Sequence, residues 1–197
     1  MSEKIQIVAF STNETDQNPN DIINTFLEQQ NHIILKKTRN AIAFSTQLNN
    51  SQKNTKIMIC SVLNLGREYT GITDVNCYII FIDLEKETSK EKFESIISYA
   101  KDYCDLTKKI FIFGMINVNT NKDEENTPNE KCINKDDITK ILENTDIIYE
   151  YKELDLSNIK DIYDVIINIL VYSSKHSISS DTIEETEKDQ SGSCNIF

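Results

Sequence analysis

Short apolar runs separated by polar stretches dominate the chain. Each run is rich in Ile, Val, Phe or Tyr and has polar flanks, which is typical of a buried strand. We predict strands at residues 5–10, 41–48, 56–62, 77–84, 109–116 and 147–154. The runs that begin at Cys77 and Lys109 are almost continuously apolar. This pattern favours central strands of a parallel sheet that is covered on both faces.

Apolar residues at helical spacing lie between these runs. We predict helices around residues 22–27, 93–100, 138–142 and 159–170, entered through Asn20 or Asp21, Ser89, Asn134 and Ser157. The alternation of strands and helices indicates an α/β protein with right-handed crossovers. Polar residues 49–54 predict a hairpin turn between two strands, so one edge of the sheet is antiparallel. We therefore expect a mostly parallel six-stranded sheet with helices on both faces.

The sequence divides into a predicted globular domain, residues 1–172, and a polar tail, residues 173–197. From Ser173 onward the apolar periodicity stops and Ser, Asp and Glu dominate, a composition typical of disorder. Residues 117–131 are also polar and predict a long exposed loop. No stretch approaches 18 consecutive apolar residues, and the N-terminus lacks a signal-peptide pattern. We therefore expect a cytoplasmic protein without a spanning helix.

Composition excludes several classes of function. The formal net charge of −11 argues against sequence-independent binding to nucleic acid, whose phosphates need Lys and Arg. The five cysteines are widely spaced without a CxxC pair, and the two histidines lie far apart. A disulfide framework, a zinc site or a Cys/His catalytic pair is therefore not expected.

The element order over residues 4–172, followed by a polar tail and a terminal cysteine box, resembles a small GTPase of the Ras superfamily, and within it the Rab group. Residues 36–44 resemble the first switch running into its strand, and residues 66–69 stand where the family has its second switch. Residues 77–83 followed by 89–93 resemble the family's "YDIT…SF" passage. The resemblance implies a small-GTPase-like fold of the P-loop NTPase type. It also implies a partner-binding surface at Lys36, Lys37, Thr38, Ile42, Phe44 and Tyr69, for which an ordinary exposed strand and loop is the alternative.

The phosphate-binding loop of that family has lost its defining residues here. In GxxxxGK[ST] the glycines let backbone N–H groups wrap the phosphates, the Lys neutralises them, and the hydroxyl holds Mg²⁺. The corresponding residues 11–20 contain no glycine and no lysine, and Pro19 falls about where the Lys belongs. Glu14 and Asp16 would each repel a phosphate by about 1 kcal/mol at the dielectric of a protein surface. The degenerate loop positions that we single out are Ser11, Thr12, Asn13, Pro19 and Asn20.

Three further nucleotide motifs also fail. The metal-reaching DxxG becomes Ser61-Val62-Leu63-Asn64, the guanine-reading NKxD becomes Met115-Ile116-Asn117-Val118, and the SAK-like loop becomes Lys152-Glu153-Leu154-Asp155. Thr38 alone survives at the switch position. We therefore expect that GTP binding has been lost, and we predict no catalytic residue, cofactor or metal. GTP or GDP with Mg²⁺ would be bound only if the chain is instead an active, very divergent GTP hydrolase.

The terminal residues Cys194-Asn195-Ile196-Phe197 fit a prenylation box. Phe at the last position favours geranylgeranylation of Cys194, although Asn195 is not aliphatic. The preceding tail is acidic, so it lacks the basic patch that often supplies a second membrane signal.

Together these features predict a prenylated, Rab-like adaptor that binds protein partners on the cytoplasmic face of a membrane, in vesicle traffic or signalling. Two alternatives remain open: the active divergent GTPase, and a soluble structural subunit whose terminal cysteine is incidental.

Overall fold

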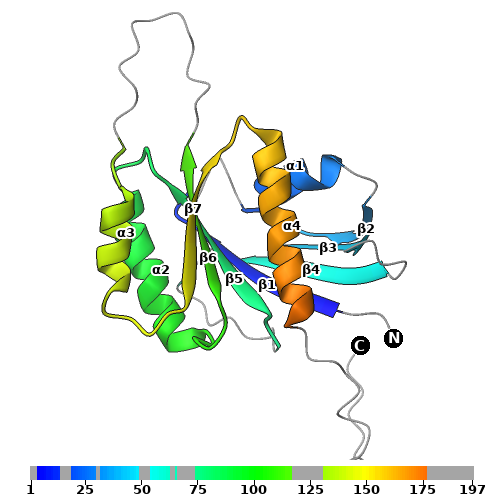
Figure 1. The fold of residues 1–197 in the computed structure, drawn as a ribbon, viewed down its shortest axis with the longest axis horizontal. Coiled ribbons are helices and arrows are strands. Elements are labelled where there is room, and N and C mark those ends of the chain that lie inside the picture. The colour runs from blue at the N-terminus through cyan, green and yellow to red at the C-terminus, as the bar shows by residue number, and fades with distance from the viewer. Residues whose placement is uncertain are drawn as a thin grey trace, which may run out of the picture.

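The computed structural model describes residues 4–13, 19–29, 32–48, 54–62, 65, 74–116 and 131–176. Within these residues the chain forms seven strands and four helices (Figure 1). The strands are β1 Lys4–Ser11, β2 Ile33–Lys37, β3 Ala41–Gln47, β4 Asn54–Val62, β5 Cys77–Asp83, β6 Ile110–Ile116 and β7 Tyr149–Asp155. The helices are α1 Pro19–Glu28, α2 Ser89–Tyr103, α3 Lys135–Leu142 and α4 Ile159–Lys175.

The strands form one mixed sheet in the order β2-β3-β4-β1-β5-β6-β7. Strands β4, β1, β5, β6 and β7 are parallel to their neighbours in this row, whereas β3 is antiparallel to both β2 and β4. The predicted α/β class, the mostly parallel sheet and the antiparallel edge are confirmed. The predicted number of six strands is wrong, because β2 adds a seventh strand at the edge.

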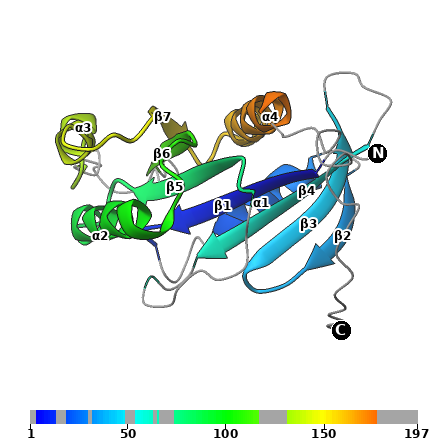
Figure 2. The same ribbon diagram turned by 90° about the horizontal axis from the view of Figure 1, so that it is seen from below.

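Helices cover both faces of the sheet, as predicted. Helices α1 and α4 bury one set of side chains, including Ile7 on β1 and Phe81 on β5. Helices α2 and α3 bury the alternate set, including Val8 and Ile80. The two views in Figures 1 and 2 show the helix pairs on opposite sides of the central strands. Side chains of successive strand residues point to opposite faces, so these apolar runs fill two cores at once.

Three helices start at other residues than their sequence predictions gave. Helix α1 begins at Pro19, ahead of the predicted caps Asn20 and Asp21, and α2 follows Thr88, with Ser89 as its first helical residue. Asn134 caps α3 as predicted, in a reciprocal capping box with Asp137. Helix α4, however, is capped by Asn158, because the Ser157 hydroxyl instead donates to Asp155. Helix α4 also runs on through Lys175, since Ser173 is buried with its Oγ 3.2 Å from Cys77 Sγ. The predicted start of the tail at residue 173 is therefore three residues early.

None of the helices in the described part of the chain is long and apolar enough to cross a membrane. Residues 117–130 of the predicted loop over 117–131 and residues 177–197 of the predicted tail over 173–197 lie outside the described residues.

Candidate functional site

The carboxyl end of the sheet between β1 and β5 is the first candidate site. Strand β1 lies between β4 and β5, and the sheet continues to β3 and β2 beyond β4 and to β6 and β7 beyond β5. Ligands of open α/β sheets bind at such a topological switch point, outside the carboxyl ends of the strands. Ser11, Thr12 and Asn13 reach this point from β1, and Asp83 to Lys86 reach it from β5.

Thr12 joins three elements at the switch point. Its backbone N–H donates to the Phe81 carbonyl at 3.0 Å, and its Oγ1 accepts from the Asp83 N–H at 3.0 Å. The same Oγ1 lies 3.2 Å from the hydroxyl of Ser89 at the start of α2. Thr12 and Ser89 are almost fully buried. This predicted loop residue therefore fastens β1, β5 and α2 together inside the protein.

Asn13 and Lys86 form a second, half-buried layer of the same network. The Lys86 ammonium donates to Asn13 Oδ1 at 3.0 Å and lies 3.8 Å from Asp83 Oδ2. The Asn13 side-chain amide donates to that Asp83 carboxylate at 3.4 Å. The Asn13 amide, the Lys86 ammonium and the Asp83 carboxylate are thus partners of one another, and these contacts need no ligand.

The described donors at the end of β1 are directed into the protein. The Asn13 N–H donates to Ser11 Oγ at 3.0 Å, and the Thr12 N–H is paired with Phe81. A phosphate cradle needs successive backbone N–H groups that point outward at the anion. Helix α1 then begins with Pro19, which has no N–H, and carries Asp21 in its first turn. The Asn20 side chain lies outside the described residues.

The hairpin between β2 and β3 contains most of the predicted partner-binding residues. Thr38 closes the hairpin turn: its Oγ1 donates to the Ala41 carbonyl at 3.3 Å and accepts from the Ala41 N–H at 3.0 Å. Lys36 and Lys37 are exposed on β2. The structure removes Ile42 and Phe44 from this surface, because both are fully buried beneath α1 and α4. Tyr69 and Cys194 lie outside the described residues.

Sequence reasoning missed the exposed apolar residues next to those lysines. Ile33, Ile34 and Leu35 on β2 are 59%, 54% and 51% exposed. In the sequence they form an apolar run like the core strands, so the run itself does not reveal that it lies uncovered at an edge. Contiguous exposed apolar side chains are unusual and often mark an interaction site.

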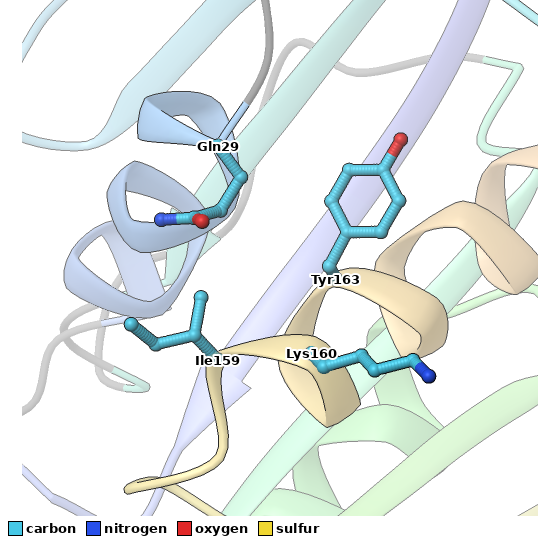
Figure 3. Close-up of a pocket in the computed structure, with 4 residues that line it drawn as sticks. All are labelled: Gln29, Ile159, Lys160 and Tyr163. Carbon is cyan, nitrogen blue, oxygen red and sulfur yellow. The ribbon is translucent and has the colours of Figure 1, made fainter.

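A surface pocket of about 410 Å³ lies where the end of α1 meets the start of α4. Gln29, Ile159, Lys160 and Tyr163 line it, and Figure 3 shows Lys160 extending away from Gln29. The Tyr163 ring stacks on Phe26 at 5.3 Å. These four residues include no carboxylate, thiol or imidazole.

Two of the described thiols are unreactive at neutral pH, and no metal cluster is found among the described residues. Burial raises the pKa of Cys77 to about 12 and the pKa of Cys104 to about 11, so both thiols stay protonated at neutral pH. Across the described ranges, no group of three or more His, Cys, Asp or Glu side chains is placed to hold a metal ion.

Comparison with known proteins adds no family assignment. No protein-family model matches the chain, and no curated protein matches it significantly.

Proposed function

We propose that this chain is a Rab-like protein of the small-GTPase fold that does not bind GTP in the family's manner and acts as a protein-binding adaptor. A prenyl group on Cys194 would attach it to the cytoplasmic face of a membrane. The element order supports the fold: a first strand and helix are followed by β2, β3 and β4, of which β3 is antiparallel to both neighbours, and then by β5, β6 and β7 in alternation with helices. This order agrees with the family resemblance of the sequence.

The switch-point network is the observation that carries the loss of nucleotide binding. The two described N–H groups after β1 donate within the protein, and Lys86 is held by Asn13 and Asp83. To bind a triphosphate, the chain would have to break these contacts and then place the Asp83 carboxylate near the anion. Unmade hydrogen bonds of buried groups cost about 1–3 kcal/mol each, which removes several factors of ten in affinity.

The surface around β2 supports the adaptor role. Its exposed apolar and basic side chains lie on a hairpin that Thr38 closes through its hydrogen bonds to Ala41. A partner would therefore meet the same face at all times, without control by a γ-phosphate.

The test measures binding of labelled GTP and GDP to the purified full chain, with and without Mg²⁺. We expect no binding at 100 µM nucleotide, about a hundredfold above the micromolar range. Micromolar affinity that disappears when Mg²⁺ is removed would overturn the proposal in favour of an active GTPase.

A Lys86→Ala variant is the matched control for this assay. Lys86 is the described cation at the switch point, and it is partly exposed. Weak nucleotide binding that is equal in the wild type and in Lys86→Ala would arise away from the switch point. Such binding would not support the hypothesis of an active GTPase.

A further inference from the structure

The edge strand β2 lies in a basic region of an otherwise acidic protein. Residues 29–67 contain six basic and no acidic residues, so they carry a formal charge of +6 while the rest of the chain carries −17. Strands β2, β3 and β4 lie within this region. Such a separation of charge makes the β2 edge attractive to an acidic segment.

The β2 edge can also accept another strand. Strand β2 is the last in the sheet order and pairs with β3 in the described residues, so its other side presents backbone N–H and C=O groups. Its apolar side chains Ile33, Ile34 and Leu35 are more than half exposed, and Lys36 and Lys37 follow directly. An extended acidic segment would bond the backbone groups, cover the apolar side chains and pair with the lysines.

The C-terminal segment of the chain has this chemistry. Residues 177–197 carry five acidic residues and one lysine. The acidic residues are Asp181, Glu184, Glu185, Glu187 and Asp189. We propose that this tail adds to β2 as an eighth strand and covers the partner-binding surface of its own molecule.

The end of α4 lies level with β2, so the tail starts in a suitable place. The strand registers align Lys37 with Ile42, Ile59, Ile7 and finally Cys77. Cys77 contacts Ser173 near the end of α4. At about 4.8 Å per strand, the position outside β2 is about 24 Å from β5, and the helix layer adds about 10 Å of height. About eight extended residues span this distance, so the segment from Glu184 onward reaches β2.

A tethered segment also has the advantage of proximity. A tether of this length gives an effective concentration in the millimolar range, so even weak pairing is well populated. Attachment of Cys194 to a membrane would pull the tail away from β2 and uncover the surface. A second copy of the chain fits less well, since each molecule carries a net charge of −11 and like charges repel.

The test is hydrogen exchange of the backbone amides of residues 33–37 in the unlipidated full chain at 50 mM salt. The test variant replaces the five tail carboxyls: Asp181→Asn, Glu184→Gln, Glu185→Gln, Glu187→Gln and Asp189→Asn. The matched control makes five charge-neutralising changes on exposed residues of the helices and their ends: Glu91→Gln, Glu94→Gln, Asp102→Asn, Asp136→Asn and Glu143→Gln. Both variants have a formal charge of −6.

We expect the amides of β2 to exchange at least tenfold faster in the tail variant than in the wild type, and the control to behave as the wild type. A synthetic peptide of residues 177–193 should restore protection to the tail variant. The same peptide should fail when Lys36→Glu and Lys37→Glu are also present. Protection should weaken in 1 M salt, where charges are screened beyond about 3 Å.

Equal exchange in the wild type and the tail variant would overturn the proposal. Protection that rises with protein concentration and persists in the tail variant would overturn it too, by assigning the edge to a second copy. The contact between the tail and β2 would regulate the surface that the proposed function assigns to partner binding, so it rests on that proposed function. Its failure is nevertheless distinguishable, because the exchange assay contains neither membrane nor nucleotide.

Discussion

His32 lies in surroundings that disfavour a positive charge. Its ring packs 4.7 Å from Phe26 and 5.8 Å from Phe44, and its Nδ1 lies 3.0 Å from Thr46 Oγ1. Among the described residues, its Nε2 is buried without a hydrogen-bond partner. A proton on both ring nitrogens would therefore place a charge where nothing accepts it.

Burial lowers the pKa of His32 below its usual value of 6.5, which makes the stability of the fold depend on pH. The unfolded chain binds this proton more readily than the folded chain, so stability is fully present above pH 6.5 and falls as the pH drops towards the folded pKa. We expect His32→Phe to remove this dependence. The slope of the free energy of unfolding against pH should then differ from the wild-type slope by at most the contribution of one bound proton. Urea denaturation at pH 7.5, 6.5 and 5.5 measures it.

His176 provides the control for this experiment. It is exposed at the end of α4, where its Nδ1 lies 2.8 Å from the Tyr172 carbonyl. His176→Gln should keep the wild-type loss of stability between pH 6.5 and 5.5. Equal slopes for the wild type and His32→Phe would contradict the assignment to His32.

Single residues also show where sequence reasoning stops. The polar character of Ser11, Thr12 and Asn13, without glycine or lysine, predicts that an ordinary phosphate loop has been lost, and this stays a prediction. The residues do not reveal their replacement contacts, because Asp83, Lys86 and Ser89 are about 70 residues away along the chain. Likewise, Ile42 and Phe44 cannot be distinguished from Ile33 and Ile34 by polarity, since only the positions of α1 and α4 decide which are covered.

At the scale of elements, burial decided which strands could be predicted. The runs at β5 and β6 are apolar at nearly every position because both faces are covered, and their boundaries were predicted within one or two residues. Strand β2 has no buried residue and exists through its pairing with β3, which includes a register shift between Ile34 and Lys36. A strand that is held by pairing alone leaves no alternation in the sequence.

The joint between β1, β5 and α2 gives a prediction at this scale. Thr12→Val keeps the side-chain shape but leaves the Asp83 N–H and the Ser89 hydroxyl without their partner. Unsatisfied buried groups cost about 1–3 kcal/mol each, so we expect a loss of about 2–4 kcal/mol in the free energy of unfolding. Chemical denaturation followed by circular dichroism measures this loss.

Thr12→Ser is the matched control, because it retains the hydroxyl and removes one buried methyl group. We expect it to cost about 1 kcal/mol, the transfer free energy of one buried carbon. If Thr12→Val and Thr12→Ser destabilise the protein equally, the hydroxyl does not hold the three elements together.

At the scale of the whole molecule, the proposed function divides between the described sheet and the C-terminal residues. The sheet buries its central strands between two helix pairs and leaves its basic edge uncovered by them (Figure 2). The strand and helix pattern predicts the two-layered core, because core packing follows from the spacing of apolar residues. The same pattern does not predict a partner for the β2 edge, because complementarity between two surfaces depends on the partner's surface as well.

The proposed anchor at Cys194 gives the last prediction. A prenyl chain contributes about 0.8 kcal/mol per buried CH₂ group, whereas the acidic tail and the anionic lipids of the cytoplasmic leaflet repel each other. The lipid therefore supplies the attraction, and Cys194→Ser should move an N-terminally tagged chain fully into the soluble fraction of cells. The wild-type chain should stay in the membrane fraction in high salt, because its attachment does not depend on charge pairing.

Cys132→Ser controls for loss of a thiol as such, since Cys132 is an exposed cysteine outside the terminal box. This variant should fractionate as the wild type does. Mass spectrometry of the C-terminal peptide completes the test, because prenylation with processing removes Asn195, Ile196 and Phe197 and adds the lipid mass to Cys194. An intact, unmodified terminus in the membrane fraction would show that attachment comes from a partner protein and that the terminal cysteine has no role in it.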